Sequence, residues 1–332
     1  MYYRIDAVDS WFFRDAAPYD AGVNTDGESI FPPFPSVYAG ALRNCAIPIP
    51  SPNSTKNTFA RRLKIGWNGA LADGHMLFPI PLDLYITENA DKQLTAREMV
   101  LTSATGSSFP LNCFLKSPEK LKKPPYISGG AYLDDIAIKT YLNAGQSDYS
   151  VYSLGDYFSK ETRIGIRIDP SSGTVADGQL YQQTLITPKN DSRQCSLALE
   201  ASGIEVPPKS VVRIGGDSKL GTISRIEEEL PLSNMPNIES NNYFKLYLAT
   251  PAIFEKGWLP GWINKENMIG IFTYKKRRVR IKLISAEVGK PVAIGGFGFV
   301  STGENKNNKE YRPKEMRYAA PAGSVYYFKL SD

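Results

Sequence analysis

The feature that most constrains the fold is a strictly alternating segment near the middle of the chain. Within residues 161–169, isoleucine occupies every second position, at Ile164, Ile166 and Ile168. Arg163 and Arg167 stand between the isoleucines. Because successive side chains of a β-strand point to opposite faces, the segment predicts a strand with one apolar face and one basic face.

A turn and a second strand-like run follow this segment. Pro170–Gly173 is a typical turn sequence, and residues 174–184 again favour a strand, so the sequence predicts an exposed β-hairpin. Strand patterns dominate elsewhere too. Further strands are predicted at residues 196–201, 210–214, 242–249, 278–284, 292–294 and 324–330.

Helical patterns are fewer. The clearest follows Phe31–Pro35, where Ser36 is a natural N-cap and Val37, Ala41 and Leu42 have helical spacing toward a core, with Arg43 near the end. Weaker helical patterns cover residues 131–142 and 264–272. The sequence therefore predicts an α+β fold with antiparallel sheets.

Composition excludes several classes of function. The chain has a single histidine, His75, and its three cysteines are widely spaced, so neither a histidine-based metal site nor a disulfide framework is predicted. No apolar run reaches the roughly 18–20 residues that span a bilayer, and the N-terminal residues lack the form of a signal peptide. We therefore expect a cytoplasmic protein with reduced thiols, no membrane association and no cofactor or metal.

Positive charge is concentrated at the C-terminal end. Residues 271–332 contain 13 Lys and Arg against 5 Asp and Glu. Within this part, Arg278, Arg280 and Lys282 alternate with apolar residues, so a strand there presents a basic ladder on one face. Such a distribution suits a polyanion such as RNA, or an acidic protein surface; a solvated basic face without a ligand is the alternative.

Two glycine pairs stand at the ends of predicted strands. Gly215–Gly216 is followed by Lys219, and Gly295–Gly296 is preceded by Lys290. Glycine allows close approach of a ligand, and its backbone N–H groups can bind an anion. Neither loop has the spacing of a Walker A or dinucleotide-binding motif. The alternative is an ordinary turn.

Several segments together resemble one known family. They are Trp11–Asp15, Phe31–Arg43, Arg163–Asp169, Gly173–Tyr181, Gly215–Gly216, Leu248–Phe254, Gly257–Pro260, Gly289–Pro291, Ile294–Gly296 and Pro313–Phe328. In this order they are similar to subunit three of the Cmr effector complex, the type III-B CRISPR ribonucleoprotein. This family belongs to the RAMP superfamily of RNA-binding proteins with glycine-rich loops.

The resemblance implies two packed ferredoxin-like (βαββαβ) units. We expect one at residues 1–205, with an insertion around 89–156, and one at 206–332 that is basic from residue 271. It also implies that the chain binds the 5′ repeat-derived tag of CRISPR RNA (crRNA). The implied protein partners are the large polymerase/cyclase-like subunit and a backbone RAMP subunit, and contact with target RNA is indirect. No catalytic residue is implied.

The predicted RNA-binding residues combine backbone N–H donors with cations. Ser36, Val37 and the two glycine pairs would bind phosphates, and the basic residues would neutralise them. The complete set is Arg14, Ser36, Val37, Arg43, Arg163, Arg167, Gly215, Gly216, Lys219, Lys290, Gly295, Gly296 and Arg317.

Two other functions stay open at this point. One is a RAMP-type endoribonuclease that processes crRNA, with His75 as general acid or base. The other is a purely structural adaptor whose basic surface contacts only an acidic partner subunit.

Overall fold

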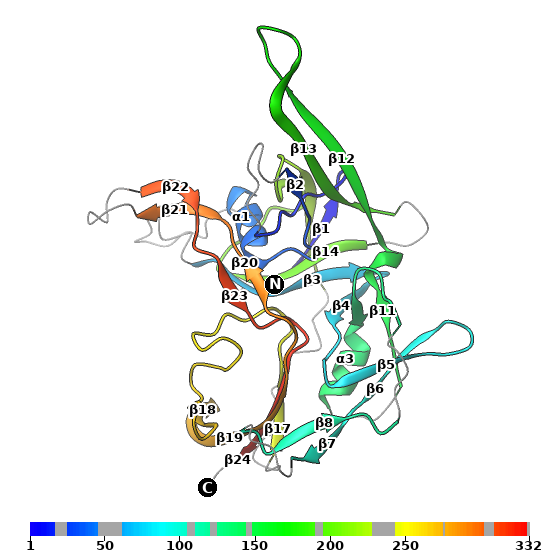
Figure 1. Ribbon diagram of the computed structural model, residues 1–332, viewed down its shortest axis with the longest axis vertical. Coiled ribbons are helices and arrows are strands. Elements are labelled where there is room, and N and C mark those ends of the chain that lie inside the picture. The colour runs from blue at the N-terminus through cyan, green and yellow to red at the C-terminus, as the bar shows by residue number, and fades with distance from the viewer. Residues whose placement is uncertain are drawn as a thin grey trace. The chain divides into compact units, whose positions relative to one another are not determined.

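The computed structural model describes residues 1–16, 25–45, 62–104, 110–119, 125–143, 148–189, 195–227, 243–274, 276–301 and 309–330 (Figure 1). Contacts divide the chain into two compact units that alternate along the sequence. The first comprises Met1–Met76, Leu154–Glu229 and Ala293–Arg317, and the second comprises Leu77–Ser153, Leu230–Val292 and Tyr318–Asp332. This grouping does not test the predicted domain boundary after residue 205, which stays a prediction.

An antiparallel sheet forms the body of the first unit. Its strands lie in the order β3-β14-β1-β16-β15. Their bounds are β3 (Lys64–Ala72), β14 (Cys195–Ser202), β1 (Tyr2–Ala7), β16 (Leu220–Ile226) and β15 (Ser210–Arg213). Ile5, Leu197 and Ile223 are completely buried, which places the core of this unit on the sheet.

Helix α1 (Pro35–Cys45) packs on this unit through Tyr38, Ala41 and Leu42. The predicted helix is therefore confirmed, but the prediction that Ser36 is its N-cap is wrong. The helix begins at Pro35, because the fixed φ of proline and its missing N–H suit the first helical position. The Val37 N–H donates to the carbonyl oxygen of Phe34 at 2.9 Å.

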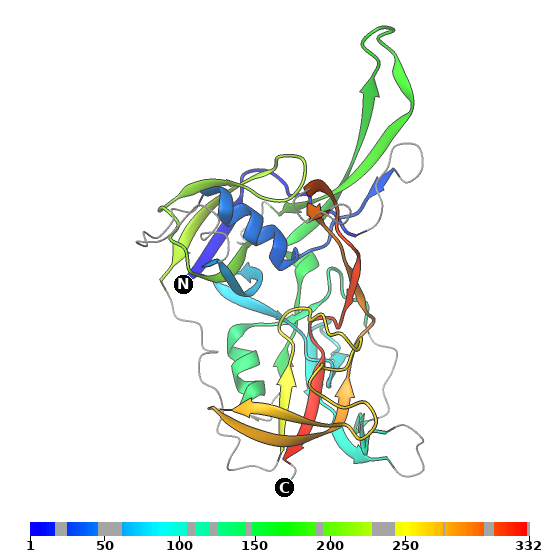
Figure 2. The ribbon, with the colours of Figure 1, turned by 90° about the vertical axis from the view of Figure 1, so that its left-hand side faces the viewer.

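The predicted hairpin is confirmed as the longest strand pair of the first unit (Figures 1 and 2). Strand β12 (Phe158–Ile168) follows the short 3₁₀ helix η1 (Leu154–Asp156) and pairs with β13 (Val175–Pro188), which also pairs with β2 (Asp26–Gly27). Its tip extends beyond the sheet of this unit.

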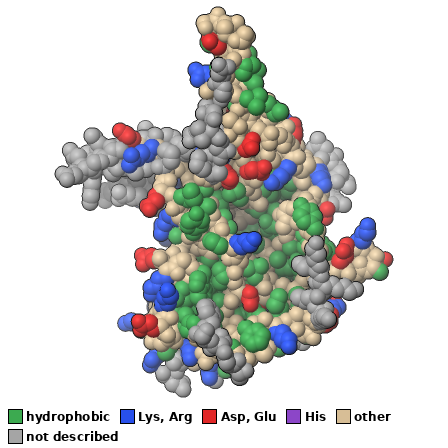
Figure 3. All heavy atoms as spheres, in the orientation of Figure 1, with side chains coloured by type: hydrophobic (Ala, Val, Ile, Leu, Met, Phe, Trp, Pro, Cys, Tyr) green, Lys and Arg blue, Asp and Glu red, His purple; other side chains and the backbone are tan. Residues whose placement is uncertain are grey.

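The isoleucine face of the hairpin is uncovered. Ile164 is 69% exposed and Ile166 is 47% exposed. Leu180, directly opposite Ile166, is 56% exposed. Figure 3 shows hydrophobic side chains along one edge of the hairpin. The predicted alternation is correct, but both faces of the hairpin are exposed among the described residues.

The second unit contains an antiparallel sheet in the order β17-β24-β19-β18. The strands are β17 (Tyr243–Tyr247), β24 (Val325–Leu330), β19 (Arg277–Glu287) and β18 (Ile269–Tyr274). One face of this sheet carries an apolar core that includes Ile281, Leu283 and Phe328.

Shorter elements complete the two units. The second unit also contains β5 (Leu84–Glu88), β6 (Leu94–Glu98), β7 (Val100–Ser103), β8 (Cys113–Lys116), β9 (Ala131–Leu133), α3 (Asp135–Leu142), β10 (Tyr149–Ser150) and β11 (Tyr152–Ser153). Strand β4 (His75–Pro79) pairs with β9. Strand β20 (Val292–Ile294) pairs with β23 (Arg317–Ala319), and β21 (Phe297–Ser301) pairs with β22 (Lys309–Pro313).

All six additional strand predictions are confirmed, and one of the two weaker helix predictions is confirmed in part, by α3 at Asp135–Leu142. Residues 131–142 divide into β9 and α3, because the Asp134 side chain accepts the Ala137 N–H and starts the helix there. The helix predicted at 264–272 is wrong. The side chains of Asn264 and Asn267 accept the backbone N–H groups of residues 266 and 269, which favours turns.

The fold class is therefore mostly antiparallel sheet with few helices, as predicted. The division into ferredoxin-like units stays a prediction. The segment 89–156, predicted as an insertion, supplies the fully buried Ala96, Ile138 and Tyr141 to the second unit.

Candidate nucleic-acid interface

The candidate surface of the first unit is built around residues Asp9–Ala16, which we call the organising segment. Its aromatic residues Trp11, Phe12 and Phe13 are all buried. Three parts of the chain that are distant in sequence contact this segment: the base of the hairpin, the loop at Gly215 and the loop at Gly295.

The base of the hairpin is attached through Trp11. Trp11 and Ile186 exchange two backbone hydrogen bonds of 2.8 Å. The indole of Trp11 also stacks on Phe31 at 6.1 Å between ring centroids, and Phe31 contacts Phe158 at 4.3 Å. Because Phe158 begins β12 and Ile186 lies near the end of β13, both strands of the hairpin are fixed to the same aromatic cluster.

The Gly215–Gly216 loop packs against the same segment. The Gly216 N–H donates to the Phe12 carbonyl oxygen at 2.7 Å. Gly215 has φ +83°, and an added Cβ would come within 2.9 Å of Cδ1 of Phe13. Glycine is therefore required here for close packing. The Gly216 N–H already has a partner, so it cannot serve as the predicted phosphate donor without breaking this hydrogen bond.

The loop positions Lys219 beside Asp9. The Lys219 ammonium lies 3.7 Å from a carboxylate oxygen of Asp9, and the Arg163 guanidinium lies 4.0 Å from the same oxygen. Arg163 also donates to Glu161 at 2.9 Å, which lowers the pKa of that carboxyl. The structure thus brings two predicted RNA-binding cations together, but around carboxylates that partly neutralise them.

One face of the hairpin combines positive charge with an aromatic ring. Tyr181 stands directly opposite Gly165 and lies so close to it that a Cβ there would overlap the ring. Arg163 and Gly165 are two positions apart, so Arg163 and Tyr181 share a face. Arg167 is exposed farther along, within the shift in register between Ile166 and Ile168.

Tyr181 was not among the predicted site residues. The signal that identifies it is an aromatic residue opposite a glycine, which becomes visible only when the strand register is known.

The second predicted glycine pair lies at the other end of the organising segment. An added Cβ on Gly295 would be 3.0 Å from Cβ of Ala16. Gly296 is exposed, and its carbonyl oxygen accepts the Lys314 N–H at 2.7 Å. Arg14 forms an isolated bridge with Ser29 two residues before Ala16. Arg317 is exposed on β23, three residues after Lys314.

Other predicted residues are not gathered in this way. Ser36 and Arg43 lie near opposite ends of α1, about 10 Å apart along the helix axis. Lys290 is exposed but belongs to the second unit, so the structure does not place it on this surface.

Two features are absent from the described residues: a cluster of potential metal ligands and a helix that could span a membrane. The described residues contain no group of three or more His, Cys, Asp or Glu that could hold a metal ion. In the same ranges, no helix has the length and apolar character needed to cross a membrane. His75 is half-buried at the start of β4.

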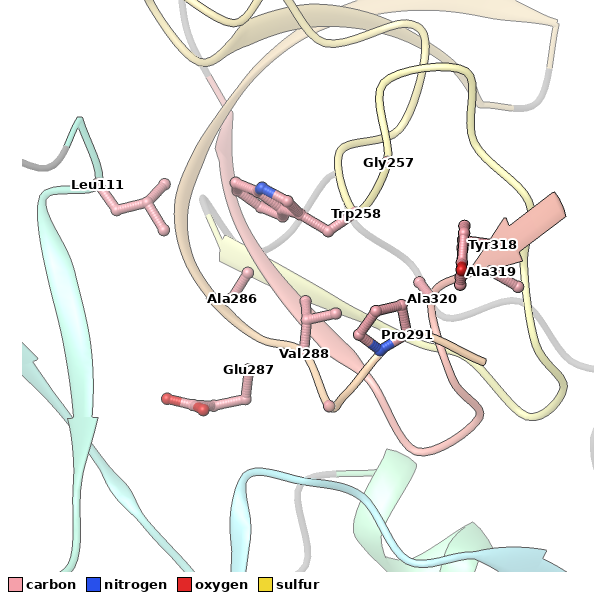
Figure 4. Close-up of a pocket in the computed structure, with 11 residues that line it drawn as sticks. Leu111, Gly257, Trp258, Ala286, Glu287, Val288, Pro291, Tyr318, Ala319 and Ala320 are labelled. Carbon is pink, nitrogen blue, oxygen red and sulfur yellow. The ribbon is translucent and has the colours of Figure 1, made fainter. Parts of the chain in front are cut away.

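A cavity of about 510 Å³ lies in the second unit (Figure 4). Most of its lining is apolar, including Trp258, Val288 and Pro291. Glu287 is the only carboxylate among the lining residues, and burial raises its pKa, with a smaller contribution from Asp83. The lining also contains the hydroxyl of Tyr318 and no Lys, Arg, His or Cys side chain.

The scaffold and the hairpin face define an antiparallel β protein whose exposed surface suits an extended polyanion. Comparison with known proteins gives the family. The chain belongs to the CRISPR-associated protein family Cas_Cmr3, whose model matches residues 3–332. The resemblance derived from the sequence is therefore confirmed.

Two solved structures contain chains of similar fold. One is a cryo-EM structure of the Type III-B Cmr-beta complex bound to cognate target RNA. It matches with a TM-score of 0.53 and 15% identity, covering 98% of this chain and 86% of that chain. The other, bound to cognate target RNA and AMPPnP, matches with a TM-score of 0.52 and 14% identity over the same shares of both chains. A comparison with curated proteins found no match.

Proposed function

We propose that the chain is a non-catalytic subunit of a type III-B (Cmr) RNA-guided antiviral effector complex that binds the 5′ repeat-derived tag of crRNA. In this proposal it bridges the large polymerase/cyclase-like subunit to a backbone RAMP subunit and meets target RNA only indirectly. Family membership and the shared fold support a role in the complex. The observation that carries the RNA-binding role is the exposed hairpin face with Arg163 and Tyr181.

This face has the properties that single-stranded RNA requires. Bases stack on aromatic rings, and cations bind the phosphates between them. Tyr181 is 38% exposed, and its ring occupies the space that a side chain at Gly165 would fill. Arg163 and Arg167 would bind phosphates of the RNA. Further phosphates would be bound along the organising segment by Lys219, Arg14 and Arg317. Arg43 and Lys290 would contact RNA separately.

The opposite face of the hairpin suits a protein partner. Ile164, Ile166 and Leu180 are each about half exposed or more. Soluble monomers rarely leave such a contiguous apolar surface uncovered. In the proposal, the neighbouring backbone subunit covers this face while RNA occupies the basic one.

The proposal is tested by purifying the chain from its host, sequencing the 5′ ends of bound RNA and identifying the companion proteins. We expect RNAs that share one short 5′ sequence, together with a large polymerase-like subunit. RNA with random ends, or no RNA, would overturn the proposal.

Removal of the hairpin cations should weaken tag binding. For the double variant R163Q/R167Q, we expect affinity for tagged RNA to fall about 10-fold or more, since each charged hydrogen bond contributes roughly 1.5–3 kcal/mol. Fluorescence anisotropy at several salt concentrations measures this. The control K64Q/R213Q removes two exposed cations from the sheet of the same unit and should bind as wild type does. Equal loss in both variants would show that only net charge matters.

Removal of Asp9 should have the opposite effect. Asp9 competes with phosphate for Lys219 and Arg163, so Asp9→Asn should raise the affinity for tagged RNA roughly 2- to 5-fold, the value of an exposed ion pair. The same anisotropy assay measures it, with Glu205→Gln as an exposed control in the same unit. Weaker binding by Asp9→Asn would contradict the competition.

The endoribonuclease alternative depends on His75. If His75→Ala leaves RNA cleavage unchanged, or if the wild-type chain does not cleave crRNA precursors, this alternative is removed.

A further inference from the structure

The sheet β17-β24-β19-β18, which Figure 2 shows as a ribbon, has a second face opposite its apolar core. The strand register places several basic residues on that face. Residues that are directly opposite in a ladder share a face. Lys282 is opposite Lys329, and Lys329 is opposite Tyr243. Arg278 and Arg280 lie on the same face of β19 as Lys282, because they are four and two positions away, respectively. We call Tyr243, Arg278, Arg280, Lys282 and Lys329 the basic face.

The cations of the basic face have no described anionic partner. No carboxylate of a described residue lies within 4 Å of any of these cations. Three of them, Arg278, Arg280 and Lys329, are exposed. The direct pairing of Lys282 with Lys329 is unfavourable, since like charges opposite each other in a sheet repel. A bound anion would relieve this repulsion.

The other end of the same face shows the contrast. There Lys245 lies 3.4 Å from Asp83 and 3.8 Å from Glu98. Its ammonium also lies 3.5 Å above the ring of Tyr141. The sheet thus compensates its cation at one end with acceptors from the same unit, whereas no described carboxylate accompanies the cations at the other end.

The form of the basic face suits a phosphate backbone. The cations on β19 recur every second residue, about 7 Å apart, along one line. Tyr243 is 55% exposed, and the Lys329 ammonium lies 5.6 Å from its ring centroid. An aromatic ring beside a line of cations is the arrangement that binds single strands without reading their sequence.

We propose that the basic face binds the phosphate backbone of a single-stranded RNA, independently of the 5′ tag. The proposal rests on the RNA-binding function proposed above and adds a second contact, on the other compact unit. The strand could be the guide or the target, which offer the same chemistry; a direct contact with the target would add to the indirect contact proposed above.

The test uses the full chain and an oligo-uridine RNA that lacks the tag. For K282Q/K329Q, we expect the slope of log affinity against log salt to become shallower by about 1.4, since each cation on a single strand contributes roughly 0.7. The melting temperature at low salt should stay equal or rise, because the repulsion is removed. The control K139Q/K265Q removes two exposed lysines of the same unit and should leave the slope unchanged. An unchanged slope in K282Q/K329Q would overturn the proposal.

Further comparisons between variants distinguish this proposal from the tag-binding function. If R163Q/R167Q loses tagged RNA while K282Q/K329Q binds oligo-uridine normally, tag binding stands and the basic face is not an RNA site. If K282Q/K329Q instead weakens only a salt-sensitive association with a partner subunit, the ligand is an acidic protein and the proposal fails. In the assembled complex, 4-thiouridine placed in either the guide or the target shows which strand crosslinks to Tyr243, and absence of both crosslinks contradicts the proposal.

Discussion

Trp11→Ala should lower the free energy of unfolding of the first unit by about 3–5 kcal/mol, the usual cost of removing a buried large aromatic side chain. Trp11 is completely buried and contacts Phe13, Phe31 and Phe158 at 5.8 to 6.1 Å between ring centroids. Its loss would leave a cavity where the hairpin joins the sheet. We therefore expect RNA affinity to fall along with stability.

Urea unfolding followed by tryptophan fluorescence and circular dichroism measures this effect, and hydrogen exchange assigns it to the first unit. Val8→Ala is a suitable control, because Val8 is 59% exposed just before the same segment and should change stability by less than about 0.5 kcal/mol. Equal stability of the two variants would show that the aromatic cluster does not hold the hairpin.

Asp83→Ala should destabilise the second unit by about 3–5 kcal/mol, as expected when one partner of a buried charged network is removed. Asp83 is completely buried and accepts hydrogen bonds from Tyr141 at 2.7 Å and Tyr327 at 2.6 Å. Lys245 lies 3.4 Å away, with a side chain only 19% exposed. In Asp83→Ala, the Lys245 ammonium and the hydroxyls of Tyr141 and Tyr327 would lose the carboxylate that they share.

Chemical denaturation measures the loss, with Asp91→Ala as an exposed control. A second readout is the titration of tyrosine absorbance. Burial is the main cause that raises the pKa of Tyr141 and Tyr327, and the charge of Asp83 raises both further. In the more conservative Asp83→Asn, these hydroxyls should therefore ionise at lower pH than in wild type. A loss below about 1 kcal/mol in Asp83→Ala would contradict the network's role.

The sequence predicted the strands well because their pattern is local. Alternation in residues 161–169 and 278–284 is sufficient to place the hairpin and the basic ladder. Helix starts were predicted less well, since they depend on competing side chains. Helix α1 begins at Pro35, so Ser36 is not its cap. Asn264 and Asn267 form turns in a segment whose spacing favours a helix.

The candidate site was predicted only as separate residues. Arg163 and Lys219 were both identified, but their common neighbour Asp9 was not, because no sequence pattern links three positions so distant in the chain. Tyr181 was missed for a related reason, since its partner Gly165 is defined by strand register. Gly216 was interpreted as an anion donor because the sequence cannot show that the Phe12 carbonyl already accepts its N–H.

The discontinuity of the first unit has a consequence for biosynthesis. Its organising segment is translated long before the Gly295 loop that contacts Ala16. A nascent chain that has been synthesised only as far as the hairpin still lacks this loop. Chains that stall before this loop would therefore present an unfinished candidate surface, so the proposed binding of RNA should follow synthesis of the Gly295 loop.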